Sequence, residues 1–338
     1  MLYLDNNHLQ AIGLCWEELE SCIVEALRLL GSGDYAQPIK PYLRYGNPAN
    51  RIIAMPAYVG GTVQAAGLKW IASFPGNTLS GLPRAHSVLL LNKVDTGVPY
   101  AILNSPLPSV ARTVAVSAVM LRHYLQARPA EGRIRVGIIG FGPVGQHHYD
   151  MCGKLFGECI EEVLIYDIRG AKLGTHVIDE ADADYRGRTR FAESWQELYS
   201  SCNVIITCTV SDHRYIDQPP LAGSLLLDVS LRDYKVSALE QIQGIVVDDW
   251  DEVCRENTDI ELLHLERGLT KNDTCSLADV VCRDALGKFA EGESILFCPM
   301  GMAVFDIATA AYWVEKAQSL GVGLDLADRY NGNHSSKA

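Results

Sequence analysis

The 338-residue sequence predicts an α/β protein in which a doubly wound parallel sheet is inserted into a discontinuous α+β domain. From residue 134 to about residue 250, apolar runs typical of buried strands alternate with helical patterns, as in a parallel sheet covered by helices. The flanking segments lack this alternation. We therefore predict one domain from residues 1–127 plus 300–330, an inserted domain from 132–299, and a disordered tail at 331–338.

The flanking segments predict helices and an antiparallel sheet. Apolar residues recur at helical spacing over 15–30, 110–126 and 303–319. Short apolar segments broken by Gly, Pro and Asn predict antiparallel strands at 51–59, 66–72, 86–92 and 99–103, after a short strand at 2–4. With few helices to cover it, this sheet is expected to keep one face uncovered.

The alternating region predicts five parallel strands, at 134–139, 163–166, 203–209, 224–229 and 244–248. Helices are expected near 144–157, 194–200 and 235–242. Together these elements give the doubly wound pattern.

A glycine-rich turn, Gly140-Phe-Gly142-Pro143-Val144-Gly145, follows the first of these strands. The first glycine permits a tight turn, the second lets the backbone approach a pyrophosphate, and the third lets the new helix pack closely on the sheet. The N-terminus of that helix offers N–H groups to an anion. The pattern predicts a Rossmann-type dinucleotide-binding domain.

Asp167 ends the next strand, in the region where an acid binds the ribose diol of a dinucleotide. A carboxylate there repels a 2′-phosphate, which favours NAD over NADP, although Arg169 could accommodate that phosphate. Thr207 and Thr209 end another parallel strand, where cofactors lie in this fold. We expect them, and Met302 just before the last helix, to contact the cofactor.

The composition excludes several classes of protein. The formal net charge is −12 and no cluster of Lys and Arg is present, so nucleic acid is not an expected partner. The ten cysteines form no Cys-x-x-Cys pair and no zinc-site spacing, and we predict no bound metal. We also find no signal peptide and no long apolar run, so a cytoplasmic protein without membrane contact is expected.

Four cations precede the glycine turn in apolar or turn-rich surroundings: Arg44, Lys69, Arg84 and Arg112. A single Lys or Arg in such a segment commonly lies on a solvated face. Arg112 differs because its neighbours from Ser109 to Ala118 are otherwise small or apolar, which predicts a buried guanidinium. A buried guanidinium needs a partner, and a carboxylate ligand would suit it.

These cations, the glycine turn and the segment Pro-Met-Gly301-Met-Ala-x-x-Asp306 together resemble the ornithine cyclodeaminase/mu-crystallin superfamily. The resemblance covers about residues 1–325. Further segments resemble one branch of it, whose members oxidise N-(2-amino-2-carboxyethyl)-L-glutamate to make 2,3-diaminopropionate for siderophores: Gln37-Pro-Ile-Lys-Pro-Tyr-Leu-Arg44, Arg51-Ile-Ile-Ala-Met-Pro56, Leu68-Lys-Trp-Ile71, Val204-Ile-Ile-Thr-Cys-Thr-Val210 and Val246-Val-Asp-Asp-Trp250.

The resemblance implies hydride transfer to NAD from the glutamate α-carbon, followed by hydrolysis of the imine to 2-oxoglutarate and 2,3-diaminopropionate. It implies that Arg44, Lys69 and Arg112 hold the substrate α-carboxylate, and that two copies of the chain associate through the N-terminal sheet. Since this substrate carries three carboxylates, we assign Arg84 to a side carboxylate. Lys69 is also a candidate catalytic residue.

The chain departs from the superfamily at one place. Cyclodeaminases carry an acid after a glycine at the end of one strand, whereas here the segment is Leu227-Asp-Val-Ser-Leu-Arg-Asp-Tyr234. Ring closure to proline is therefore doubtful. Asp233 lies near the expected place and is a candidate for proton transfer, with a solvated loop acid as the alternative.

Asp306 also has two interpretations. It lies in the first turn of the last helix, where an acid interacts favourably with the helix dipole. Dipole stabilisation therefore explains it as well as substrate contact does. Two other functions stay open for the whole protein: a cyclodeaminase or alanine/ketimine dehydrogenase of the same superfamily, and a mu-crystallin-like binding protein without turnover.

Overall fold

The computed structural model describes residues 1–128, 133–170 and 175–326 of the chain. The predicted tail at 331–338 lies outside the described residues. The chain divides into two compact units. The antiparallel unit contains Met1–Cys15, Gly33–Ser109 and the segment from Ala303, and the parallel unit contains Trp16–Ser32 and Val110–Met302.

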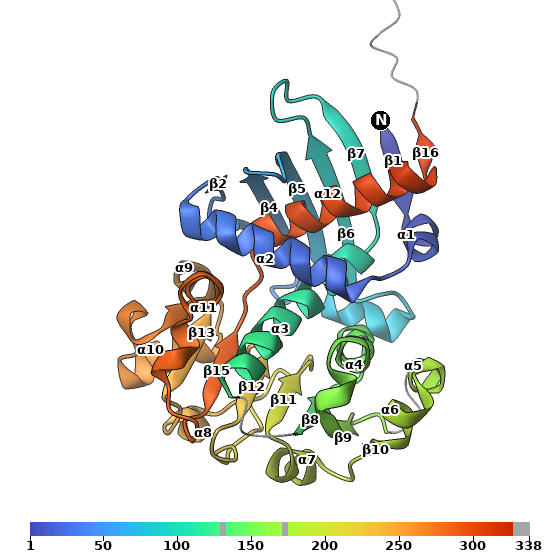
Figure 1. Ribbon diagram of the computed structural model, residues 1–338. Helices are drawn as coiled ribbons and strands as arrows, with labels where there is room; N and C mark the ends of the chain where they lie inside the picture. The colour runs from blue at the N-terminus through green and yellow to red at the C-terminus, as the bar shows by residue number, and fades with distance from the viewer. Residues whose placement is uncertain (129–132, 171–174, 327–338) are drawn as a thin grey trace, which may run out of the picture. The chain divides into compact units, whose positions relative to one another are not determined.

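The antiparallel unit is built on one sheet with the order β16-β1-β7-β6-β5-β4-β2, to which β3 is added beside β4 (Figure 1). All its strand pairs are antiparallel except β1 with β7. The elements are β1 (Leu2–Asp5), α1 (Asn6–Ile12), β2 (Tyr35–Ala36), β3 (Tyr42–Leu43), β4 (Arg51–Val59), β5 (Ala65–Ser73), the 3₁₀ turn η1 (Pro75–Ser80), β6 (Ala85–Asn92), β7 (Pro99–Asn104), α12 (Ala303–Leu320) and β16 (Leu324–Asp325). The predicted antiparallel strand set is thus confirmed.

One face of this sheet is covered by α12, which crosses β4, β5 and β6 (Figure 1). The contact is close because Gly67 on β5 has no side chain. A Cβ atom there would lie 2.2 Å from the Leu90 carbonyl oxygen and 3.1 Å from Ile307 of α12. Alternate residues of β5 therefore point toward α12, including Ala65 and Lys69.

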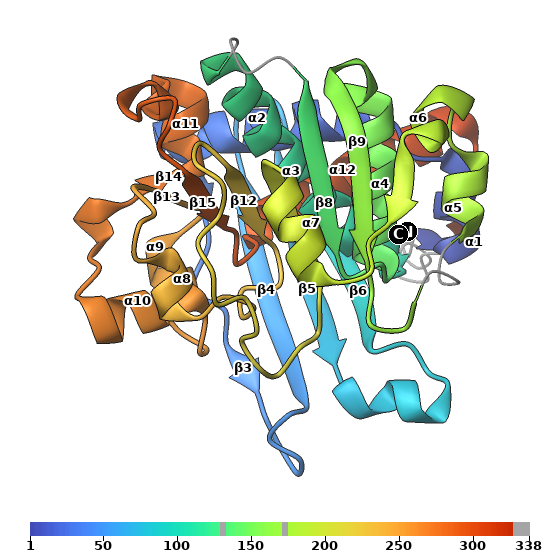
Figure 2. The same cartoon turned by 90° about the horizontal axis from the view of Figure 1, so that it is seen from below.

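The parallel unit contains an eight-stranded sheet with the order β10-β9-β8-β11-β12-β15-β13-β14, in which every pair is parallel (Figure 2). Its strands are β8 (Ile134–Ile139), β9 (Ile160–Tyr166), β10 (Thr189–Phe191), β11 (Val204–Thr207), β12 (Leu225–Asp228), β13 (Gly244–Val247), β14 (Cys275–Ser276) and β15 (Ile295–Cys298). Its helices are α2 (Trp16–Ser32), α3 (Leu107–Ala127), α4 (Pro143–Phe156), α5 (Thr175–Glu180), α6 (Ala183–Gly187), α7 (Trp195–Ser201), α8 (Val236–Leu239), α9 (Trp250–Val253), α10 (Asp259–Arg267) and α11 (Leu277–Arg283).

Helices lie on both faces of this parallel sheet. Ile138 of β8 is next to the start of α4, since its side chain is 3.4 Å from a Cβ placed on Gly145. The adjacent residues Gly137 and Ile139 face the other way, where they pack with Leu198 of α7. Because neighbouring residues of a strand point to opposite faces, α4 and α7 cover opposite sides. The predicted doubly wound sheet is confirmed.

The two units do not follow the predicted boundaries at residues 127 and 132, because α2 and most of α3 belong to the parallel unit. Helix α2 packs against α4 and α11. Helix α3 is tied to the same unit by two hydrogen bonds, from Tyr124 to the Gly223 carbonyl at 2.7 Å and between Ser117 and His148 at 3.0 Å. The prediction placed both helices with the antiparallel sheet because they precede the glycine turn in the sequence, whereas the structure places α2 and most of α3 in the parallel unit.

Candidate active site

The glycine turn has the steric requirements that the sequence predicted. Gly140 has φ +92°, and a Cβ there would lie 2.7 Å from the Cys208 carbonyl oxygen. A Cβ on Gly145 would lie 2.1 Å from the Gly140 carbonyl oxygen. Helix α4 begins at Pro143, and its N-cap Gly142 has no side chain to accept the first amide protons. These amides and the positive end of the helix dipole suit a pyrophosphate, so the turn fits a dinucleotide.

Asp167 is connected to this turn at the carboxyl end of β9. Its Oδ2 accepts a hydrogen bond from the Phe141 amide at 2.7 Å, and its Oδ1 accepts from the Arg169 amide at 2.9 Å. The Arg169 guanidinium reaches both oxygens, at 2.9 and 3.0 Å. Burial alone would raise the pKa of Asp167, but the hydrogen bonds from Arg169 and Phe141 together lower it. The carboxylate is therefore ionised at neutral pH.

A row of polar side chains lies at the carboxyl ends of β11, β12 and β15. The Thr207 hydroxyl donates to Asp228 Oδ1 at 3.2 Å, and the Cys298 thiol donates to Asp228 Oδ2 at 3.2 Å. Burial and the nearby carboxyls of Asp259 and Asp233 raise the pKa of Asp228 well above its usual value. Thr207 is fully buried by these contacts, whereas Thr209 keeps some exposure.

Asp233 is fully buried, so its interpretation as a solvated loop acid is wrong. Its carboxylate accepts hydrogen bonds from the hydroxyls of Thr209 and Ser230. Its own amide donates to Asp259 Oδ2 at 3.1 Å. Burial raises the pKa of Asp233, and the hydroxyl donors counteract part of that rise. The side chain connects the loops that follow β11 and β12.

Lys69 of the antiparallel unit forms a buried ion pair that the sequence did not reveal. Its Nζ lies 2.7 Å from Asp306 Oδ2, and each side chain is only 1% exposed. The Ser109 hydroxyl lies 3.4 Å from the same Nζ. Lys69 lies on the face of β5 that α12 covers, and Asp306 lies in the first turn of α12. Asp306 thus has a role beyond the helix dipole.

Arg112 of the parallel unit is buried, as predicted, with 8% exposure. Its guanidinium packs against Gly301, because a Cβ on Gly301 would lie 2.4 Å from Nη1 and 2.9 Å from Cζ. Met302, in the same loop, is also buried.

The two remaining predicted cations lie in the antiparallel unit. Arg44 is exposed, with its Cζ 5.0 Å from the ring centre of Tyr42. Arg84 is half-buried and immediately precedes β6. The structure thus brings Lys69 together with Asp306 in one unit and Arg112 together with Gly301 in the other.

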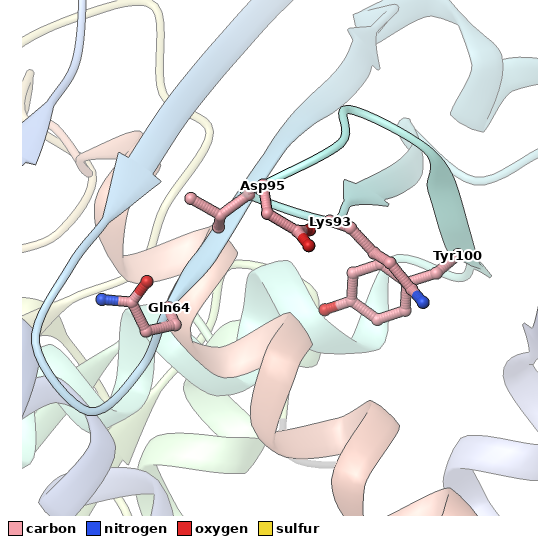
Figure 3. A pocket seen from close by; sticks show the side chains of 5 residues that line it. Gln64, Lys93, Asp95 and Tyr100 are labelled. Carbon is pink, nitrogen blue, oxygen red and sulfur yellow. The ribbon is translucent and has the colours of Figure 1, made fainter.

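The antiparallel unit also has two hollows that do not involve these cations. One of about 420 Å³ lies beside the β4–β5 and β6–β7 turns, and Lys93, Asp95 and Tyr100 face it (Figure 3). The other, of about 580 Å³, is an apolar groove over the face of the sheet opposite α12, and Pro56, Leu68 and Leu90 help to line it. This second hollow is part of the uncovered sheet face that the sequence predicted.

Comparison with known proteins assigns the chain to a family. The model of the ornithine cyclodeaminase/mu-crystallin family matches residues 11–321. The chain belongs to this family. One relative is the N-((2S)-2-amino-2-carboxyethyl)-L-glutamate dehydrogenase of Staphylococcus aureus. It is 33% identical to this chain, and the match covers 96% of the chain and 98% of the relative.

Two other proteins are less similar in sequence. The alanine dehydrogenase of Archaeoglobus fulgidus is 26% identical over 91% of the chain and 92% of the relative. The structure of Thermococcus litoralis Delta(1)-pyrroline-2-carboxylate reductase, in complex with NADH and L-proline, has a TM-score of 0.82 at 24% identity, and the match covers 96% of this chain and all of that one. Within the described residues, no helix is both long enough and apolar enough to cross a membrane.

Proposed function

We propose that this family member is an NAD-dependent dehydrogenase that converts N-(2-amino-2-carboxyethyl)-L-glutamate and water to 2-oxoglutarate and L-2,3-diaminopropionate. The observation that carries this proposal is the 33% identity, over nearly the whole length of both chains, to a dehydrogenase named for that compound. The diaminopropionate would supply a siderophore or a peptide antibiotic.

The reaction has two balanced stages. The glutamate α-carbon loses a hydride and the secondary amine loses a proton, so that the C–N bond becomes a C=N bond. Water then adds to that carbon, and the C–N bond breaks to leave the ketone of 2-oxoglutarate and the primary amine of diaminopropionate. NAD, when bound, supplies the acceptor for the hydride.

The residues around the glycine turn fit this cofactor. The N–H groups at the start of α4 would bind the pyrophosphate, with Gly140, Gly142, Pro143, Val144 and Gly145 shaping the turn. Asp167 is ionised and lies at the carboxyl end of β9, where it would accept the ribose hydroxyls and repel a 2′-phosphate. Thr207, Thr209 and Met302 are proposed further contacts with the cofactor.

The cations fit a substrate with three carboxylates. Arg44, Lys69 and Arg112 would bind the α-carboxylate of the glutamate part, and Arg84 would bind a side carboxylate. Ion-paired binding by an arginine is strong only when its N–H groups match the carboxylate geometry. Replacement of Arg84 by alanine should therefore raise KM for the substrate, and an unchanged KM would remove Arg84 from this role.

We assign proton transfer to Lys69: as a neutral amine it would accept the proton that the substrate amine releases, and Asp306 would stabilise the ammonium that forms. The charged atoms of the two side chains are 2.7 Å apart, and both side chains are shielded from water. The Lys69 ammonium would then pass this proton to the primary amine of the product, which regenerates the base. Asp233 is the second candidate, although its buried carboxylate is already held by Thr209 and Ser230.

The deciding experiment follows NADH absorbance with the purified protein, NAD and the glutamate–diaminopropionate conjugate. Parallel reactions contain ornithine or L-alanine. NADH formation with release of 2-oxoglutarate, only from the conjugate, is the expected result. Proline and ammonia from ornithine would instead indicate a cyclodeaminase, and turnover of alanine alone would indicate an alanine dehydrogenase.

We further propose that the enzyme is a homodimer that uses the uncovered face of the antiparallel sheet. Trp70 and Val88 are 43% and 37% exposed there, on adjacent strands β5 and β6 and in register with each other. An apolar groove continues beside them. Exposed apolar faces of this kind mark association sites. Sedimentation should give a dimer for the native protein and a monomer for Trp70→Glu, and a native monomer would contradict the proposal.

A further inference from the structure

We propose that Asp248 is a positioning residue that fixes the loop supporting the substrate-binding guanidinium of Arg112. The inference rests on the proposed function for the role of Arg112, and it adds a residue that does not itself contact the substrate. All the groups involved belong to the parallel unit.

Asp248 immediately follows β13 and is 6% exposed. Its Oδ1 accepts hydrogen bonds from the Asp249 amide at 2.9 Å and the Met300 amide at 3.0 Å. Its Oδ2 accepts from the Gly301 amide at 2.6 Å. Strands β13 and β15 are paired, with Val247 opposite Cys298. One buried carboxylate therefore fixes the loop that follows the neighbouring strand.

This loop is shaped to fit the Arg112 guanidinium. Gly301 has φ +82°, a conformation that residues with a Cβ rarely adopt. A Cβ there would lie 2.4, 2.8 and 2.9 Å from Nη1, Nη2 and Cζ of Arg112. Because Nη1 and Nη2 both lie nearer to this point than Cζ does, the edge of the guanidinium that carries the two terminal nitrogens packs beside Gly301.

Contact along this edge restricts where the terminal nitrogens lie and hence the direction of their N–H groups. Two-point binding of a carboxylate depends on the orientation of these N–H groups. A displacement of Gly301 would tilt the guanidinium away from its productive orientation while leaving its charge in place. Asp248 thus acts on the substrate carboxylate through the backbone of Met300 and Gly301.

Asparagine at position 248 is the sharpest perturbation. Its amide has one acceptor oxygen, and its NH₂ group would face a backbone N–H donor, so at least one loop hydrogen bond is lost. Asp249 provides the matched control because it is the adjacent carboxylate with a different role. Its side chain accepts from the Glu252 amide at 2.9 Å and caps α9.

The experiment measures substrate KM, kcat and the Kd for NADH in Asp248→Asn and Asp249→Asn. Asp248→Asn should raise KM about tenfold or more, as expected when a hydrogen bond to a buried charged group is lost, while kcat and the Kd for NADH change much less. Asp249→Asn should leave KM within about twofold of the native value, because asparagine caps the N-terminus of a helix about as well as aspartate does. An equal rise in both variants would overturn the proposal.

A double-variant comparison separates positioning from general destabilisation. In an Arg112→Lys background, Asp248→Asn should have little further effect on KM, because the planar group that it positions is already gone. Additive effects would overturn the proposal. Gly301→Ala perturbs the same contact from the loop side, and it should raise KM as well if Asp248→Asn does not fold.

Amide hydrogen exchange makes the test independent of turnover. The amides of Met300 and Gly301 should exchange faster in Asp248→Asn and at the native rate in Asp249→Asn. Unchanged exchange in Asp248→Asn would overturn the inference, whatever the substrate is. If the native protein does not oxidise the conjugate, the proposed function fails, and the exchange result still decides the role of Asp248.

Discussion

The buried pair of Lys69 and Asp306 gives the sharpest prediction for stability and activity together. Asp306→Asn keeps the size of the side chain and an oxygen that accepts a hydrogen bond, and removes only the negative charge. The two side chains are 1% exposed, and their charged atoms are 2.7 Å apart. Water therefore cannot replace the lost partner of the Lys69 ammonium.

The magnitude follows from this geometry. At 2.7 Å and an effective dielectric constant of about 20, two unit charges attract by about 6 kcal/mol. The desolvation of the pair offsets part of that attraction in the native protein. Removal of one partner from a buried pair typically costs about 3–5 kcal/mol, because the other charge stays buried. We expect Asp306→Asn to lower the free energy of unfolding by that amount.

The assay combines urea unfolding with kcat/KM for the conjugate. Glu315→Gln is the control, since Glu315 lies on the same helix and is exposed. The double variant Lys69→Met with Asp306→Leu removes both charges, which commonly leaves stability unchanged or raised. Both variants at the site should lose at least about 100-fold in kcat/KM, the usual contribution of a general acid or base.

Two results would refute this reasoning. Native stability in Asp306→Asn would mean that the pair contributes little. Substantial activity in the stable double variant would mean that the pair has a structural role alone.

Three further predictions concern the parallel unit. Gly145→Ala places a Cβ 2.1 Å from a backbone oxygen and should weaken NADH binding at least about tenfold in a fluorescence titration, whereas Gly187→Ala, with open space around it, should not. Asp167→Ser releases Arg169 toward a 2′-phosphate, so the ratio of kcat/KM for NAD to that for NADP should fall at least about tenfold, and an unchanged ratio would contradict the charge argument. Burial lowers the pKa of His148 to about 4 from an ordinary 6.5, so the unfolded chain binds a proton that the folded protein does not. Stability should therefore fall as pH drops, by about 2 kcal/mol between pH 7 and pH 5. Urea unfolding of His148→Asn should lack this loss, and equal losses in both proteins would rule it out.

The parallel sheet and the glycine turn were predictable because their signals are local. Each strand, turn and helix is specified by the consecutive residues that form it, and a repeated alternation of strands and helices is compatible with few other folds. The strand β15 (Ile295–Cys298) was missed although all four of its residues are apolar. It lies between β12 and β13 in the sheet, an order that depends on pairing across the chain and has no local signal.

The division into units was less predictable for the same reason. The apolar stripe on α2 shows that one face is buried, but not what covers it. In the structure that face belongs to the parallel unit, where Arg122 of α3 pairs with Glu20 of α2 and the Trp16 indole donates to Asp150 of α4 at 2.7 Å. A periodic pattern predicts burial, and only the tertiary contacts assign the partner.

The acidic residues of the candidate site also show that a sequence pattern does not identify the contact partner of a residue. From the sequence, Asp306 was consistent with a helix dipole and Asp233 with a solvated loop, and Asp248 was not singled out as a site residue. Each instead holds a group at the site: Lys69 for Asp306, the Thr209 hydroxyl for Asp233, and the Gly301 amide for Asp248. Their partners are distant in sequence, so no motif spacing could connect them.

The pairing of these acids also affects how the protein attracts or repels an anionic substrate. With a net charge of −12, the protein as a whole would repel the proposed substrate, which has three carboxylates. Acids whose charge is paired with an ammonium or with backbone and hydroxyl donors add less to that repulsion than free carboxylates would, so the cations can bind an anionic substrate within an acidic protein.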